Sequence, residues 1–286
     1  MSLRPLARAC ALALSLPALT AATAVAANPI ETTYKVAGPA GVATANVTDA
    51  SGNVTYNLLY PANLATSGVA APIVTWGNGT GATPSQYSGL LNQLASWGFV
   101  VVASTSTTTG TGAAMLSGAQ YLVAQNATAG GVFYHHLDTT KIAAVGHSQG
   151  AGGAVNATNN SGGLITTTIP IALPNDIWVS AGDEYYPELL TVPVLFLGGS
   201  SDVIISSPST IAGFYNDVPG AAAKAVLKGA GHNTIQGTGG GFLGYITAWL
   251  RYRLAGDTYA RGAFAGAAPE INANTSWQNQ AEKHVP

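Results

Sequence analysis

Residues 141–157 read KIAAVGHSQGAGGAVNA, a short apolar stretch that leads into the motif Gly-x-Ser-x-Gly and continues with small residues. The motif centres on Ser148, with a glycine two positions away on either side. In some enzymes this motif forms a sharp turn from a strand into a helix, and its glycines let the two elements approach closely. Here a predicted strand over 141–146 precedes the serine and a predicted helix over 149–157 follows it. We therefore predict that Ser148 is a nucleophile on a strained turn, in preference to one more serine in a chain rich in small residues.

Short apolar strands and helices alternate from about residue 70 onward. The predicted strands lie at 71–79, 99–105, 141–146, 167–174, 192–199 and 223–229, and the predicted helices at 83–98, 112–126, 149–157 and 241–256. This alternation predicts an α/β fold with a mostly parallel central sheet and helices on both faces. Exposed strands at 32–38, 42–48 and 54–61 are expected to add an N-terminal antiparallel part. Without a linker or an internal repeat, residues 28–286 are expected to form a single catalytic domain.

The chain of 286 residues carries few charges. It has 10 Lys and Arg against 12 Asp and Glu, a formal net charge of −2, and its charged residues make up 8% of the total. About a quarter is usual for soluble proteins, so Thr, Ser, Asn, Gln and Gly must supply the polar surface. A weakly charged surface of this kind favours a secreted protein. It also excludes nucleic-acid binding that depends on basic side chains, since such binding neutralises phosphates.

The N-terminus carries the pattern of an export signal. Arg4 and Arg8 precede the apolar stretch 9–19, and small residues follow at the cleavage position. We predict a signal peptide over residues 1–27 and a secreted mature protein, extracellular or periplasmic. The apolar stretch is too short for stable membrane insertion. Cys10 is the only cysteine, so the predicted mature chain has no disulfide and no thiolate chemistry.

A serine nucleophile needs a base, and the base needs an orienting acid. His232 follows the predicted strand 223–229 in a loop of small residues, VLKGAGHNT. Asp202 follows the strand 192–199 in VPVLFLGGSSDVIIS, between the serine and the histidine in chain order. All three residues come just after predicted parallel strands, at the sheet edge where ligands bind in such folds. We predict Ser148, His232 and Asp202 as the catalytic residues.

Other candidates for these roles remain open at this point. The loop after the strand 167–174 supplies competing acids, and the paired histidines 135 and 136 resemble metal ligands but have no ligating partners near them in the sequence, so no metal site is predicted. Another histidine lies in the polar C-terminal tail. These alternatives are Asp176, Asp183, Glu184, His135, His136 and His284.

Two backbone N–H groups are needed to bind the oxyanion of the transition state. The N–H of Gln149, directly after the nucleophile, is one candidate. The other is expected from the glycine-rich loop GNGTGAT over 77–83, with Thr80 as the first choice and Gly79 and Gly81 as alternatives. The side chains predicted to contact substrate are His147, Trp178 and Tyr87.

Five stretches give the chain a family resemblance over residues 30–265. They read LASWGFVVVAST, LDTTKIAAVGHSQGAGG, VPVLFLGGSSDVII, GAGHNT and AWLRYRLAGDTYARGAF. In order and spacing they resemble the bacterial cutinases and polyester hydrolases (PETase-like) of the α/β-hydrolase superfamily, near its dienelactone-hydrolase and chlorophyllase-like branches. The resemblance implies an α/β-hydrolase fold, the triad Ser148, Asp202 and His232, and an oxyanion hole made by Thr80 and Gln149.

The chain also departs from this group. The resemblance implies Met after the nucleophile, an aromatic residue at position 80 and a C-terminal disulfide, where this chain has Gln149, Thr80 and no mature cysteine. We expect a serine hydrolase of carboxylic esters, monomeric and without a cofactor, acting on a small ester or a polymer surface. A peptidase or amidase on the same fold, and a non-catalytic binding protein, are the alternatives.

Overall fold

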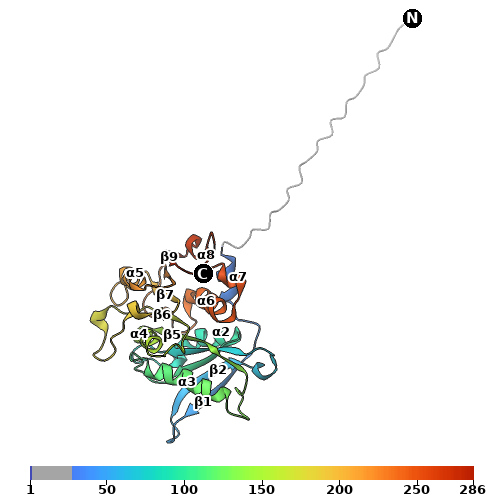
Figure 1. The fold of residues 1–286 in the computed structure, drawn as a ribbon. Coiled ribbons are helices and arrows are strands. Elements are labelled where there is room, and N and C mark those ends of the chain that lie inside the picture. Colours follow the sequence, from blue (N-terminus) through green and yellow to red (C-terminus); the bar gives the residue numbers. More distant parts are fainter. Residues whose placement is uncertain (2–27) are drawn as a thin grey trace.

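Nine strands form one sheet in the computed structural model, which describes Met1 and residues 28–286 (Figure 1). The strand order is β1-β2-β4-β3-β5-β6-β7-β8-β9. The strands span Val42–Thr48 (β1), Val54–Pro61 (β2), Ala71–Gly77 (β3), Val100–Ser104 (β4), Leu137–His147 (β5), Thr167–Ile171 (β6), Val194–Gly199 (β7), Ala222–Leu227 (β8) and Trp277–Lys283 (β9). The six strands from β4 to β8 run parallel, whereas β1, β2 and β9 pair antiparallel at the edges. The predicted mostly parallel sheet with N-terminal antiparallel strands is therefore confirmed.

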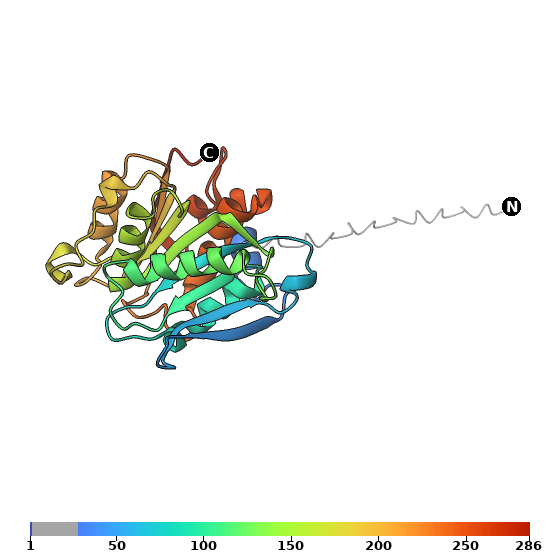
Figure 2. The same ribbon diagram turned by 60° about the horizontal axis from the view of Figure 1, so that its bottom comes forward.

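Helices cover both faces of the sheet (Figure 2). They span Pro29–Lys35 (α1), Ser88–Ser96 (α2), Ala113–Asn126 (α3), Gln149–Asn159 (α4), Pro208–Asp217 (α5), Leu243–Ala255 (α6), Thr258–Arg261 (α7) and Glu270–Ala273 (α8). Because successive side chains of a strand point to opposite faces, each central strand contributes side chains to two hydrophobic cores, one on each face of the sheet. Val74 and Trp76 of β3 pack in the core under α2 and α6, whereas Ile73 packs in the core under α3.

The prediction of a strand over 32–38 is wrong, because residues Pro29–Lys35 form helix α1. The carboxylate of Glu270 accepts hydrogen bonds from the backbone N–H groups of Ile30 (2.7 Å) and Glu31 (2.8 Å) in the first turn of α1. An acceptor at a helix N-terminus satisfies N–H groups that have no partner within the helix. This contact joins segments about 240 residues apart, so local alternation in the sequence could not reveal it.

Strand β9 and helix α5 were missed by the sequence interpretation. The residues of β9 other than Trp277 and Ala281 are polar, and only Trp277 is buried, so the strand has no alternating apolar pattern. Its pairing with β8 makes it a strand. Helix α5 begins at a Ser–Pro step, where the side chain of Ser207 accepts a hydrogen bond from the N–H of Thr210 (3.1 Å).

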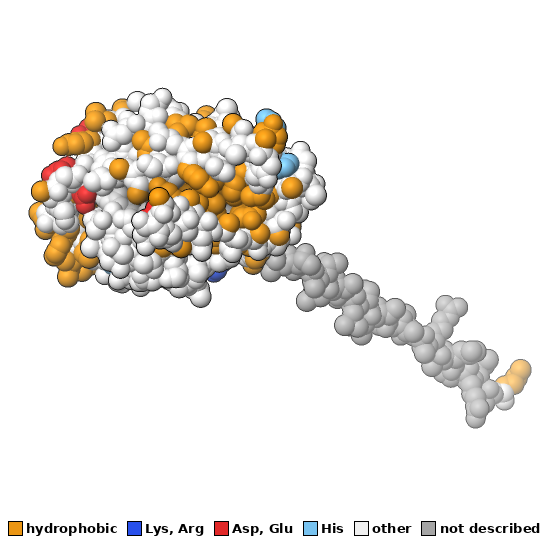
Figure 3. All heavy atoms as spheres, turned by 90° about the horizontal axis from the view of Figure 1, so that it is seen from below, with side chains coloured by type: hydrophobic (Ala, Val, Ile, Leu, Met, Phe, Trp, Pro, Cys, Tyr) orange, Lys and Arg blue, Asp and Glu red, His pale blue; other side chains and the backbone are white. Residues whose placement is uncertain are grey.

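On the face shown in Figure 3, acidic and basic side chains are sparse, and hydrophobic side chains gather near the middle. Within residues 28–286, no helix combines the length and the apolar character needed to cross a membrane. The predicted signal peptide, residues 1–27, lies outside the described residues apart from Met1.

The turn from β5 into α4 is packed against β3 through glycine backbone. A Cβ at Gly146 would lie 1.9 Å from the carbonyl oxygen of Gly150, and one at Gly150 would lie 2.2 Å from that of Gly77. No rotation of a side chain relieves such contacts, because the neighbouring atoms belong to the backbone. Strand β5, the serine turn and strand β3 can therefore approach this closely only with glycine at these positions.

Gly150→Ala is expected to lower the free energy of unfolding by about 3 kcal/mol, the upper end of overpacking costs. The matched control is Gly213→Ala, since Gly213 is an exposed residue of α5 and a Cβ there meets nothing within 4 Å. That variant should gain up to about 1 kcal/mol from helix propensity. Chemical unfolding of both variants checks this, and a Gly150→Ala protein as stable as Gly213→Ala would contradict the packing account.

Candidate active site

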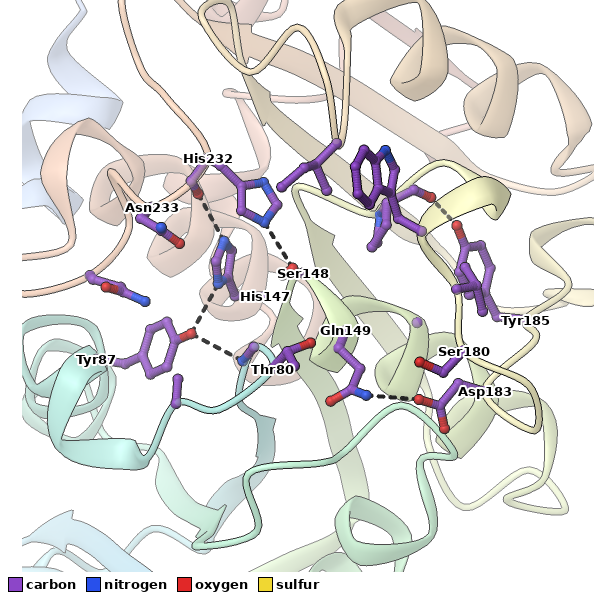
Figure 4. A pocket seen from close by; sticks show the side chains of 18 residues that line it. Thr80, Tyr87, His147, Ser148, Gln149, Ser180, Asp183, Tyr185, His232 and Asn233 are labelled. Atoms are coloured by element: carbon purple, nitrogen blue, oxygen red, sulfur yellow. Dashed lines mark hydrogen bonds between the residues drawn. The ribbon is translucent and has the colours of Figure 1, made fainter.

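A pocket of about 280 Å³ opens at the carboxyl ends of the parallel strands (Figure 4). Loops that follow β3, β5, β6, β7 and β8 supply its walls. The residues predicted from the sequence come together here, and the lining includes Thr80, Tyr87, His147, Ser148, Gln149, Trp178 and His232. Ligands of open α/β sheets bind at this edge, so the pocket lies where the fold predicts a site.

Ser148 lies between β5 and α4 in a strained conformation. Its backbone has φ 56° and ψ −123°, a region that residues other than glycine seldom adopt. Its N–H donates to the carbonyl oxygen of Ile171 at the end of β6 (2.9 Å). Strain of this kind costs on the order of 1–3 kcal/mol and persists only where the surroundings impose it. The turn leaves the Ser148 hydroxyl facing the pocket.

His232 connects Ser148 to a buried carboxylate. Its Nε2 lies 2.8 Å from the hydroxyl oxygen of Ser148, and its Nδ1 lies 2.5 Å from Oδ2 of Asp202. A carboxylate can only accept, so Nδ1 carries the proton and Nε2 accepts the hydroxyl proton of Ser148. The three side chains therefore form one hydrogen-bonded series with His232 at its centre.

The Asp202 carboxylate is held in place and kept ionised. It is 4% exposed, and its other oxygen accepts the backbone N–H groups of Ile205 and Ser206 (3.2 Å each). Burial by itself would raise the pKa of Asp202, but the hydrogen bonds from His232, Ser206 and Ile205 outweigh burial and lower that pKa below its ordinary value.

The competing acids are bonded to other groups than His232, although Asp183 also lines the pocket. Asp183 accepts a hydrogen bond from the side chain of Gln149 (2.8 Å), and Glu184 accepts the N–H of Gly182 (2.8 Å). Asp176 begins the short 3₁₀ turn Asp176–Trp178. Among the described residues, no three His, Cys, Asp or Glu side chains are placed to hold a metal ion, and His135 and His136 belong to no such group.

The loop after β3 distinguishes the three candidate donors at 79–81. The N–H of Gly79 donates to the hydroxyl of Tyr87 (3.0 Å), and the N–H of Gly81 donates to the carbonyl of Thr107 (2.9 Å). The N–H of Thr80 has no acceptor among the residues described. Gln149 is the first residue of α4, so its N–H has no acceptor within the helix. Thr80 and Gln149, which line the pocket together with Ser148, are therefore the expected oxyanion donors whose N–H groups these bonds leave available (Figure 4).

The three side chains predicted to contact substrate differ in exposure. Trp178 is 52% exposed on the pocket wall, where its indole N–H donates to the carbonyl of Ile204 (3.0 Å). Tyr87 and His147 are 0% and 1% exposed and form the innermost part of the lining. The hydroxyl of Tyr87 lies 3.0 Å from Nδ1 of His147, and Nε2 of His147 lies 2.8 Å from the carbonyl oxygen of His232.

Asn78 fixes the loop after β3 and was missed by the sequence interpretation. Its side chain is fully buried, donates to the carbonyls of Ser104 (2.6 Å) and Ser106 (3.0 Å), and accepts the indole N–H of Trp76 (3.0 Å). An asparagine between glycines is typical of a turn, and only contacts distant in sequence show that this one is an anchor.

Burial makes His147 a source of acid sensitivity. Burial, followed by the nearby His232, lowers the pKa of His147 to about 3, whereas an unfolded chain binds this proton near pH 6.5. Between these values the unfolded state holds more protons, so the free energy of unfolding decreases as the pH falls through this window.

His147→Gln is therefore expected to flatten the loss of stability between pH 6.5 and pH 5. The wild-type protein should lose about 1.6 kcal/mol more than the variant over this range, because the slope rises from about half of 1.4 kcal/mol per pH unit at pH 6.5 to nearly that full value at pH 5. Urea unfolding at both pH values measures the difference. Parallel losses in the two proteins would contradict a neutral, buried His147.

The chain matches a family model described as PET hydrolase-like over residues 19–283. A cutinase of Thermobifida fusca is 30% identical over 263 residues, which covers 83% of this chain and 80% of that protein. A bis(hydroxyethyl) terephthalate hydrolase of Streptomyces coelicolor is 27% identical, covering 79% of this chain and 69% of that protein. A cutinase of Thermobifida alba is 31% identical over 62% of this chain, and the chain spans 57% of that protein's length.

The family match covers most of the chain and includes the nine-stranded sheet, the strained serine turn and the loops that carry Asp202 and His232. The chain therefore belongs to the PET hydrolase-like family of carboxylic ester hydrolases, with the α/β-hydrolase fold.

Proposed function

We propose that the protein is a serine hydrolase of carboxylic esters in which Ser148 is the nucleophile, His232 the general base and Asp202 the orienting acid. The observation that carries this proposal is the continuous hydrogen-bonded series from Asp202 through His232 to Ser148 at the mouth of a pocket. Among the described acids, Asp202 is the one bonded to the imidazole of His232. No cofactor is required for this chemistry.

The proposed reaction begins when Nε2 of His232 removes the hydroxyl proton of Ser148 as the oxygen attacks the ester carbonyl. Asp202 stabilises the imidazolium that forms. The N–H groups of Thr80 and Gln149 bind the negative charge on the carbonyl oxygen, and they need little reorganisation because the backbone fixes them.

In the second half of the proposed reaction, the imidazolium of His232 gives its proton to the departing alcohol, and an acyl ester remains on Ser148. A water molecule, deprotonated by the same nitrogen, then attacks this ester and releases the acid. The hydroxyl of Ser148 is regenerated with its hydrogen bond to His232.

The rim of the pocket supports polyesters as the finer substrate proposal. Trp178 lines the pocket, and the exposed side chains of Ile177, Val203 and Ile204 lie within two residues of the pocket-lining Trp178 or Ile205 in the chain. The bond from the Trp178 indole to the carbonyl of Ile204 fixes the ring on the pocket wall. We propose that this rim contacts the apolar part of an ester, and the names of the relatives, cutinase and bis(hydroxyethyl) terephthalate hydrolase, support a polymer or its fragments.

We also propose that the protein acts outside the cytoplasm as a monomer of one catalytic domain over residues 28–286, after removal of residues 1–27. The charge pattern of the N-terminus and the 8% of charged residues support this location.

Ser148→Ala should abolish hydrolysis of p-nitrophenyl butyrate, with a decrease in kcat of at least about 10⁴-fold, because no other group on the turn can form the acyl ester. The strained turn is unchanged, so the unfolding midpoint should stay close to that of the wild type. Ser209→Ala, at an exposed hydroxyl in the first turn of α5, is the matched control and should keep full activity. Turnover by Ser148→Ala would refute the assignment.

Initial rates on p-nitrophenyl esters from C2 to C12, on bis(hydroxyethyl) terephthalate and on matched amides test the substrate class. The pocket volume and the apolar rim predict a maximum at short acyl chains and hydrolysis of the terephthalate ester. The proposed specificity for esters predicts amide rates lower by orders of magnitude. Equal rates on esters and amides would indicate an amidase. No turnover of any of these substrates would indicate a binding protein instead.

A further inference from the structure

Tyr87 and His147 form a buried bridge between the two loops that serve Ser148. The N–H of Gly79, one residue before the expected oxyanion donor, donates to the hydroxyl of Tyr87 (3.0 Å). That hydroxyl lies 3.0 Å from Nδ1 of His147, and Nε2 of His147 lies 2.8 Å from the backbone carbonyl of His232. The bridge therefore runs from the oxyanion loop to the backbone of the proposed base (Figure 4).

The partners allow one arrangement of protons along the bridge. The carbonyl of His232 can only accept, so Nε2 of His147 carries a proton. Nδ1 of the neutral ring must then accept, and the hydroxyl of Tyr87 must donate to it. This leaves the oxygen of Tyr87 free to accept from Gly79. Gly79 therefore donates to Tyr87, Tyr87 donates to His147, and His147 donates to the carbonyl of His232.

The backbone around Tyr87 is clamped to the loop that carries His232. The N–H of Gly237 donates to the carbonyl of Gln86 (2.7 Å), and the N–H of Gly89 donates to the carbonyl of Gly237 (2.9 Å). The ring of Tyr87 packs on Trp76, with centroids 4.8 Å apart. Both the backbone and the ring of Tyr87 are therefore fixed in place, which suits a residue that positions others better than a mobile substrate contact.

The side chains of Tyr87 and His147 lie close to the proposed catalytic side chains but form no hydrogen bond with them. A Cβ at Gly79 would lie 3.0 Å from the Tyr87 hydroxyl, 3.1 Å from Nδ1 of His147 and 3.4 Å from the Cβ of Ser148. The rings of His147 and His232 are 4.9 Å apart. Burial holds the pKa of His147 at about 3 in the presence of His232, Asp202 and Tyr87, so the bridge adds no positive charge beside the base at neutral pH.

We propose that Tyr87 and His147 are positioning residues whose buried hydrogen bonds fix the Thr80 N–H and the His232 imidazole relative to each other around Ser148. This inference rests on the proposed function and extends it to two residues outside the triad. The oxyanion forms only during the reaction, so loosening the bridge should lower kcat and leave KM nearly unchanged.

Steady-state kinetics on p-nitrophenyl butyrate with four variants tests the bridge. Tyr87→Phe keeps the ring and removes the hydroxyl, and His147→Leu removes both ring nitrogens. Each should lower kcat about tenfold or more with KM within about twofold, a smaller loss than the 10²–10³-fold that follows complete removal of an oxyanion donor. His147→Gln supplies one acceptor and one donor, and it should recover most of the kcat that His147→Leu loses.

Tyr245→Phe is the matched control for loss of a buried tyrosine hydroxyl. Tyr245 is fully buried, bonds to Asn274 (2.9 Å) and is not part of the pocket lining. Its kcat should equal that of the wild type, whatever happens to its unfolding midpoint. A Tyr87→Phe protein with wild-type kcat, or a His147→Gln protein as impaired as His147→Leu, would overturn the inference.

A second measurement is independent of activity. Nitrogen-15 NMR of the histidine rings in the wild type and in Ser148→Ala should show His147 neutral and protonated at Nε2 from pH 5 to pH 8. A His147 that is charged at pH 6 or protonated at Nδ1 would overturn the bridge. An inactive wild type with the expected His147 signals would instead refute the proposed function and leave the bridge intact.

Discussion

The close approach of three backbone segments at Gly77, Gly146 and Gly150 is the constraint on which the site depends. A Cβ at either end of the serine turn would overlap a neighbouring carbonyl group, so α4 can start directly against β3 only because these residues lack side chains. This contact forces Ser148 into its strained conformation and brings its hydroxyl beside the loop after β3. Close backbone packing thus places the nucleophile beside the oxyanion loop.

Asp202 and His232 lie near Ser148 because the loops that follow parallel strands all lie at one edge of the sheet. β7 leads to Asp202 and β8 leads to His232, and each loop is then fixed by its own hydrogen bonds. The hydrogen bonds from His232 and from the backbone N–H groups of Ser206 and Ile205 keep the buried carboxylate of Asp202 ionised. Tyr87 and His147 are both uncharged and are held by hydrogen bonds. The interior of the site therefore carries one buried acid and no competing positive charge.

The sequence was sufficient where function follows from the order of elements. Ser148, Asp202 and His232 could be predicted because each directly follows an apolar strand, and the structure brings the three together. It was insufficient where a contact spans the chain. Helix α1 depends on Glu270, strand β9 depends on pairing with β8, and the neutral state of His147 depends on its complete burial in the folded chain. No local pattern of polarity contains these partners.

The most direct test of the central claim is covalent trapping of the nucleophile. The wild-type protein would be treated with a fluorophosphonate ester, digested, and mapped by mass spectrometry, with His232→Ala treated in parallel. The account predicts a single phosphonylated residue, Ser148, in the wild type, and labelling slower by orders of magnitude when the imidazole is absent. Labelling at another serine, or equal labelling rates in the two proteins, would contradict a Ser148 activated by His232.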